Sequence, residues 1–173
     1  MTVATGDAKK MSDERILART DELTGLANRR KFLTEYENFV KSAGSLLILD
    51  LDGFKPVNDR LGHEIGDQLL RQVAQRFNRV IPRTGLLARL GGDEFGALIP
   101  GDEGHEVAIA IRATLSYPFA IAGNEIKLSV SIGEALSEPE NPQANLLRRA
   151  DEAMYLAKRS QAGIATWRDS IRS

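Results

Sequence analysis

The sequence contains no cysteine among its 173 residues, which excludes disulfide bonds and thiolate metal sites. Its 23 basic and 24 acidic residues nearly cancel, so it lacks the strong positive field of a general nucleic-acid-binding protein. Apolar runs such as residues 45–51 are too short to span a bilayer, and the Met1 start has no signal-peptide core. These absences predict a cytoplasmic protein that neither binds nucleic acid nor inserts into a membrane, although a longer parent protein can still be membrane-tethered.

Several nucleotide-binding and hydrolase motifs are absent as well. The sequence has no G-x-x-x-x-G-K-S/T, no G-x-G-x-x-G after a predicted strand, and no G-x-S-x-G. P-loop, Rossmann and α/β-hydrolase interpretations therefore have no support. The length is that of one domain, given about 100 to 200 residues per domain. Residues 1–12 are polar and unpatterned and are predicted to be a flexible tail, and residues 13–173 are predicted to form a single domain.

The stretch RLGGDEF, at residues 89–95, is the most informative part of the sequence. It lies between the apolar runs 86–88 and 95–99, which predicts a β-hairpin with Asp93 and Glu94 at its tip. Gly91 and Gly92 supply positive φ and leave the backbone open to a ligand. Carboxylates are hard oxygen donors that suit Mg²⁺. For these four residues taken alone, an ordinary polar turn is the alternative.

A second acidic strand end lies upstream. Residues 45–52, SLLILDLD, form a nearly continuous apolar run, which predicts a central strand covered on both faces. Side chains alternate along a strand, so Asp50 and Asp52 point to the same side. Two close carboxylates repel each other unless a cation lies between them. The alternative is a simple turn at Asp52, with Asp50 bonded to a backbone amide.

Apolar spacing predicts the other elements. The expected elements are an amphipathic helix after Arg29 and Arg30, a loop or short helical turn at 53–62, a helix at about 66–80 with Asp67 in its first turn, a helix around 107–115, paired strands at 119–122 and 126–132, a helix starting at Asn141-Pro142, and an edge strand at 164–167. The two arginines are interpreted as surface residues, and His63 receives no catalytic role. This order predicts an α/β (α+β) sandwich with a central, mostly antiparallel sheet and flanking helices, of the ferredoxin-like, polymerase-palm or nucleotidyl-cyclase-like type.

If the hairpin lies beside the central strand, the two acidic segments meet. They would then form a divalent-metal site without histidine or cysteine, which is the type used for nucleotide phosphates. Lys55 is close enough in sequence to Asp52 to neutralise a phosphate bound there.

Six motifs together resemble the GGDEF domain, the catalytic domain of bacterial diguanylate cyclases. The matching segments are DELTGLANRR at 21–30, DLDGFKPVND at 50–59, GHEIGDQLL at 62–70, RLGGDEF at 89–95, SIGEA at 131–135 and ADEAMYLAK at 150–158. The resemblance implies that residues 13–173 are a GGDEF domain that condenses two GTP into cyclic di-GMP and releases two pyrophosphates. It also implies a homodimer in which each subunit presents one GTP, and fusion to sensory or other signalling domains in the parent protein.

The resemblance also implies roles for individual residues. Asp50 and Asp93 would bind Mg²⁺ or Mn²⁺ with the backbone carbonyl of Leu51, and Glu94 would bind a second metal ion or help to deprotonate the 3′-hydroxyl. The implied substrate-binding residues are Asn58 and Asp67 for guanine, Lys55, Lys158 and the backbone of Phe54 for the phosphates, and Gly91 and Gly92 for close approach of the nucleotide. For Lys158, an interaction with the helix dipole is an equal alternative.

Two positions depart from the family pattern. Ala162 stands where family members have an arginine that contacts phosphate, and Arg159 or Arg168 are candidate substitutes. Pro82 and Gly85 stand where the family's R-x-x-D product-inhibition site would be, so feedback through that site is not expected.

Two other functions compete with a cyclase. One is a weakly active or inactive GGDEF module that binds GTP and regulates an attached partner domain. The other is a phosphate-binding or small-molecule-binding sandwich without a nucleotide role.

Overall fold

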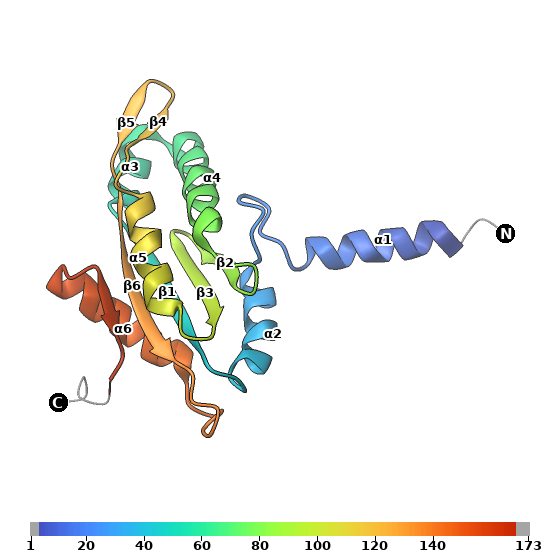
Figure 1. Ribbon diagram of the computed structural model, residues 1–173. Helices are drawn as coiled ribbons and strands as arrows, with labels where there is room; N and C mark the ends of the chain where they lie inside the picture. The colour runs from blue at the N-terminus through green and yellow to red at the C-terminus, as the bar shows by residue number, and fades with distance from the viewer. Residues whose placement is uncertain (1–3, 169–173) are drawn as a thin grey trace.

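A computed structural model describes residues 4–168 of the chain (Figure 1). Its elements in chain order are α1 (Ala4–Leu17), α2 (Arg29–Phe39), β1 (Gly44–Asp52), α3 (Phe54–Leu61), α4 (His63–Val80), β2 (Leu86–Gly91), β3 (Glu94–Pro100), α5 (Gly104–Thr114), β4 (Phe119–Ile121), β5 (Asn124–Ile126), β6 (Ser129–Leu136), α6 (Leu146–Ser160) and β7 (Ile164–Thr166). Within the described range, no helix is both long and apolar enough to cross a membrane.

Five strands form one sheet in the order β2-β3-β1-β6-β7. The central strand β1 runs antiparallel to both of its neighbours, β3 and β6, and β2 runs antiparallel to β3. At the edge, β7 pairs in parallel with β6. The predicted mostly antiparallel sheet is confirmed, and so is the edge strand that begins at Ile164.

Helices cover both faces of this sheet (Figure 1). The leucines at 47, 49 and 51 of β1 belong to a core that includes residues of α4 and α5. Leu46 and Ile48 point the other way, into a core shared with α2 and α6. Since β1 is apolar on both faces, its continuous hydrophobic run correctly predicts a strand covered on two sides.

The predicted pairing of residues 126–132 with 119–122 is correct only at its start. Strand β5 pairs with β4 as a separate two-stranded sheet, whereas β6 begins at Ser129 and pairs with β1. Ile126 and Leu128 are both buried in the same core, so the alternation of apolar residues continues through the break. The sequence pattern therefore cannot show where the chain changes partner.

Three helix boundaries also differ from the prediction. Residues 54–61, predicted to lie in a loop or short helical turn, form the helix α3, and Pro56 does not interrupt it because it lies in the first turn, where proline is tolerated. Helix α4 begins at His63, so Asp67 lies in its second turn. Helix α6 begins after Asn145, whose side chain accepts a hydrogen bond from the Arg148 amide, and not at Asn141-Pro142.

Helix α1 replaces most of the predicted unpatterned tail. It extends away from the sheet as a separate arm (Figure 1). Alanine, lysine, methionine, glutamate and arginine favour helix without any apolar stripe, so periodicity gives no signal here. The flexibility of residues 1–12 stays a prediction, and residues 1–3 and 169–173 lie outside the described part of the chain.

Candidate active site

The RLGGDEF stretch forms the predicted hairpin between β2 and β3. Gly91 and Gly92 adopt φ angles of 147° and 49°, which side chains rarely allow. No atom lies within 4 Å of where a Cβ would be at either glycine, so this turn is open to a ligand. Arg89 stabilises the turn, because it donates to the Gly92 carbonyl at 3.0 Å and pairs with Asp21 at 3.1 Å.

The tip of the hairpin lies beside the end of β1. Glu94 is directly opposite Asp50 in the strand register, and the Leu51 amide donates to the Asp93 carbonyl at 3.2 Å. The Asp50 carboxylate is also close enough to Asp93 to raise its pKa. The two acidic segments therefore converge, as the sequence predicts.

The carboxyl groups at this tip are crowded. Burial raises the pKa of Asp93, and the negative charge of Asp50 raises it further. Burial also raises the pKa of Glu94, with additional contributions from Asp151 and Asp50. Both shifts arise because the charged forms lose water and face like charges. A cation bound here would relieve this repulsion.

Lys158 provides part of the compensating charge. Its Nζ donates to Oδ2 of Asp50 at 2.8 Å and lies 3.8 Å from Oδ1 of Asp52. The hydrogen bond to Asp50 is the largest cause of the raised pKa of Lys158. Its side chain keeps 46% of its surface exposed, so the ammonium group also has access to a bound anion.

Asp52 lies on the same face as Asp50 but has different partners. Its carboxylate accepts hydrogen bonds from the hydroxyls of Ser129 at 3.2 Å and Ser131 at 2.9 Å. Strand β6 supplies both serines, opposite Asp52 and Asp50 in the register. These hydroxyls stabilise the Asp52 carboxylate. Asp50, which is opposite Glu94 in the register, is therefore the β1 carboxylate that meets the hairpin.

The donor set fits a hard divalent cation. The described residues contain no group of three or more His, Cys, Asp or Glu side chains arranged to hold a metal ion. Mg²⁺, however, is commonly held by one or two carboxylates together with water and substrate phosphates. Asp50 and Asp93 form such a pair, and because burial and the charge of Asp50 raise the pKa of Asp93, a bound cation would stabilise the charged form of this carboxyl group. The site suits Mg²⁺ or Mn²⁺ bound together with a nucleotide, and not a preformed protein cage.

The predicted guanine-reading residues lie at the junction of α3 and α4. Nδ2 of Asn58 is 3.1 Å from Nδ1 of His63. The Asn58 side chain also packs against Gly66, where any Cβ would collide with its Oδ1. The next residue, Asp67, is exposed. His63, for which no catalytic role is predicted, orients the Asn58 side chain through this contact.

The loop after β1 leads directly into α3. Gly53 adopts a φ of 87°, and its lack of a side chain leaves the helix without a side-chain cap. The first amides of α3, at Phe54 and Lys55, are therefore available to an anion, which helix N-termini favour. The Lys55 side chain is exposed beside them.

Two further charged residues influence the acidic tip. Arg29 is exposed, as predicted for a surface residue, and it lies close enough to lower the pKa of Glu94. Asp151 acts in the opposite direction on the same carboxyl group. Both residues stand inside motifs of the resemblance, but only the packing of α2 and α6 shows that they approach Glu94.

The two departures from the family pattern have clear structural settings. Ala162 is exposed just after α6, and the guanidinium of Arg159 lies 5.6 Å from the Tyr155 ring centroid. The Gly85 amide donates to the Pro82 carbonyl at 2.9 Å, so these two positions form a tight turn before β2.

Comparison with known proteins gives consistent matches. The family model described as "Diguanylate cyclase, GGDEF domain" matches residues 18–163. The response regulator PleD of Caulobacter vibrioides is 39% identical over 83% of this chain and 35% of its own length. The cyclic di-GMP phosphodiesterase PdeR of Escherichia coli is 38% identical over 94% of this chain and 26% of its own length.

A solved structure agrees with the sequence matches. The GGDEF domain of TpbB from Pseudomonas aeruginosa superimposes with a TM-score of 0.80 and 36% identity, covering 88% of this chain and 96% of that domain. The chain thus spans about a third or less of PleD and PdeR, but nearly the whole of an isolated GGDEF domain. Since the family model, the relatives and the fold agree over most of its length, the chain belongs to the GGDEF family, the diguanylate cyclase domains.

Proposed function

We propose that this chain is a diguanylate cyclase that condenses two GTP into cyclic di-GMP and releases two pyrophosphates. The observation that carries this proposal is the convergence of Asp50 and Asp93 from separate segments beside the open Gly91-Gly92 turn. Membership of the GGDEF family supports the same reaction. The predicted localisation and the fusion to signalling domains stay predictions.

In the proposed reaction, the 3′-oxygen of one GTP forms a bond to the α-phosphorus of the other. The bond from that phosphorus to the pyrophosphate oxygen breaks, and the hydroxyl proton is transferred to a base. Glu94 is the candidate acceptor, because its raised pKa suits a group that takes up a proton. The alternative role of Glu94 is to bind a second metal ion.

Asp50, Asp93 and the Leu51 carbonyl would hold Mg²⁺ or Mn²⁺. When bound, the ion would polarise the α-phosphate and stabilise the departing pyrophosphate. Lys158 would then contact both Asp50 and the substrate. Its ammonium group neutralises Asp50 and is also accessible to a phosphate.

The remaining proposed contacts position the substrate. Asn58 and Asp67 would hydrogen-bond the guanine edge, with His63 holding the Asn58 amide in place. The amide of Phe54 and the Lys55 side chain would bind phosphate at the start of α3.

The product contains two equivalent guanylate units, which suits a two-fold dimer. In such a dimer each subunit presents one GTP to the other, and the paired surfaces are the same on both chains. The rate at low protein concentration should then rise with the square of that concentration.

A GTP-binding module that regulates a partner domain is the second candidate function. Two observations favour it: Ala162 removes an expected phosphate contact, and PdeR, at 38% identity, is named as a phosphodiesterase. The GGDEF motif itself is intact, which favours the cyclase.

The test is to incubate the chain with GTP and Mg²⁺ at high protein concentration and to measure pyrophosphate and cyclic di-GMP by chromatography. If the chain is a cyclase, two pyrophosphates should form for each cyclic di-GMP. Tight binding of GTP without either product would instead support the regulatory module.

A further inference from the structure

A polar cavity of about 390 Å³ lies next to Asp52, on the side away from the hairpin. The side chains that matter here come from four elements: Asp52 on β1, Ser129 and Ser131 on β6, Lys158 on α6, and Arg112 on α5. It therefore contains two cationic groups and one carboxylate. Since both serine hydroxyls donate to Asp52, that carboxylate is already stabilised by the protein.

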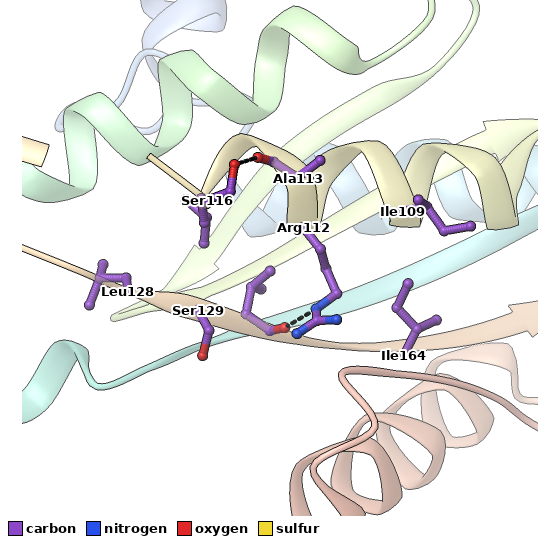
Figure 2. A pocket seen from close by; sticks show the side chains of 9 residues that line it. Ile109, Arg112, Ala113, Ser116, Leu128, Ser129 and Ile164 are labelled. Carbon is purple, nitrogen blue, oxygen red and sulfur yellow. Dashed lines mark hydrogen bonds between the residues drawn. The ribbon is translucent and has the colours of Figure 1, made fainter. Parts of the chain in front are cut away.

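Arg112 reaches this cavity from the opposite face of the sheet. Figure 2 shows its side chain extending from α5 to the backbone of β6, beside Ser129 and Ile164. Its Nε donates to the Val130 carbonyl at 3.2 Å, where β7 does not yet cover the sheet edge. The guanidinium packs directly against Gly163, a position where any Cβ would collide with it.

These contacts fix the guanidinium but leave much of its donor capacity unused. Within the described residues, the hydrogen bond to Val130 is made by Nε, and Nη1 and Nη2 have no hydrogen-bond partner from the chain. A guanidinium presents five N–H donors in a planar fork, which matches phosphate oxygens well. Arg112 is thus partly buried, held in place, and available to an anion in the cavity.

Lys158 connects this cavity to the proposed reaction centre. Its ammonium group lies 2.8 Å from Oδ2 of Asp50 and 3.8 Å from Oδ1 of Asp52, so it stands between the two sites. A triphosphate with its α-phosphate near Asp50 and Asp93 would pass Lys158 and place its terminal phosphates in the cavity.

We infer that Arg112 binds the terminal phosphates of GTP and supplies the positive charge that is missing at Ala162. This inference rests on the proposed function. The other two arginines that could replace this charge, Arg159 and Arg168, do not line the cavity. The Arg159 guanidinium lies over the Tyr155 ring instead.

The test compares nucleotides of different phosphate length. Arg112→Gln removes the charge while keeping an amide that can donate to the Val130 carbonyl. The matched control is Arg71→Gln, which removes one charge from an exposed site on α4. Calorimetry at fixed ionic strength with Mg²⁺ would measure binding of the α,β-methylene analogue of GTP, which cannot release pyrophosphate, of GMP by competition, and of tripolyphosphate.

For Arg112→Gln, about tenfold weaker binding of the GTP analogue and of tripolyphosphate is expected, because a charge-assisted hydrogen bond is lost. Binding of GMP should change less than twofold. The control Arg71→Gln should change each affinity less than twofold, as expected for an exposed, screened charge.

Three results would overturn the inference. Unchanged binding of the GTP analogue by Arg112→Gln would refute the role of Arg112 alone, because the parent chain would still bind the triphosphate. An equal loss for GMP and the GTP analogue would show a general distortion of the site. A parent chain that binds neither the GTP analogue nor tripolyphosphate would refute the proposed function together with this inference. If Arg112→Gln unfolds, Arg112→Lys, which keeps the charge without the planar fork, should show an intermediate loss of about threefold.

Discussion

Replacing Gly66 with alanine tests how the guanine end of the site is built. A Cβ at this position would lie 3.0 Å from Cγ of Asn58, closer still to its Oδ1, and 3.5 Å from Cζ of Phe54. The Asn58 amide is the movable partner, so we expect it to rotate away from Gly66 and from His63. The helix itself would remain intact, since alanine is a strong helix former.

The expected change in stability is small. Alanine stabilises a helix interior by about 0.5–1 kcal/mol relative to glycine. Moving Asn58 off its preferred rotamer costs about 0.5–1.5 kcal/mol, which nearly cancels that gain. Loss of the Asn58 contact to guanine, by contrast, should cost about 1–3 kcal/mol of binding free energy, or roughly 5- to 150-fold in KM for GTP.

The assay combines thermal unfolding with steady-state kinetics for three variants: Gly66→Ala, Asn58→Ala and the double variant. If Gly66 acts only by placing Asn58, the three variants should show nearly the same KM, because the two changes remove one interaction. Gly6→Ala is the matched control, since a Cβ there would meet no atom within 4 Å in helix α1.

Additive losses in the double variant would refute this reasoning, because they would mean that Gly66 and Asn58 act independently. An unchanged KM for Gly66→Ala would refute it as well. A large fall in melting temperature for Gly66→Ala would show that the helix, and not the Asn58 side chain, absorbs the collision.

Three further predictions follow from the structure. Asp93→Ala should abolish product formation while circular dichroism stays helical, because burial and Asp50 already raise the pKa of this carboxyl group and its charge is not needed for folding; lost helicity would mean a structural role. Added cyclic di-GMP should leave the rate nearly unchanged, since Pro82 and Gly85 form only a tight turn, and strong inhibition at low product concentration would contradict this. Phe77→Ala should lower the free energy of unfolding by about 3–5 kcal/mol in denaturant titration, because this buried ring stacks edge-on against Phe95, and a loss under 1 kcal/mol would contradict the packing.

The central strand and the hairpin could be predicted because their signals are local. Residues 45–52 are apolar on both faces, and Gly91-Gly92 requires backbone angles that few other residues adopt. The side to which Asp50 and Asp52 point also follows from simple alternation. These features depend only on residues that are neighbours in the sequence, so they can be predicted without knowing the tertiary structure.

The change of partner after Ile126 could not be predicted in this way. Ile126 and Leu128 continue one alternating pattern and enter one core, although β5 and β6 belong to different sheets. Residues 4–12 of helix α1, predicted as a tail, escaped prediction for the opposite reason, because they favour helix but form no apolar face.

The sequence by itself determined which carboxylates this protein has at its strand ends, since residue type, spacing and motif are enough to name Asp50, Asp93 and Glu94. Only the tertiary structure decided what surrounds them. The register between β1 and β6 assigns Ser129 and Ser131 to Asp52, and the packing of α5 at the sheet edge brings Arg112 to the same cavity. These partners are distant in sequence, and no local pattern encodes a contact that exists only once strands and helices are assembled.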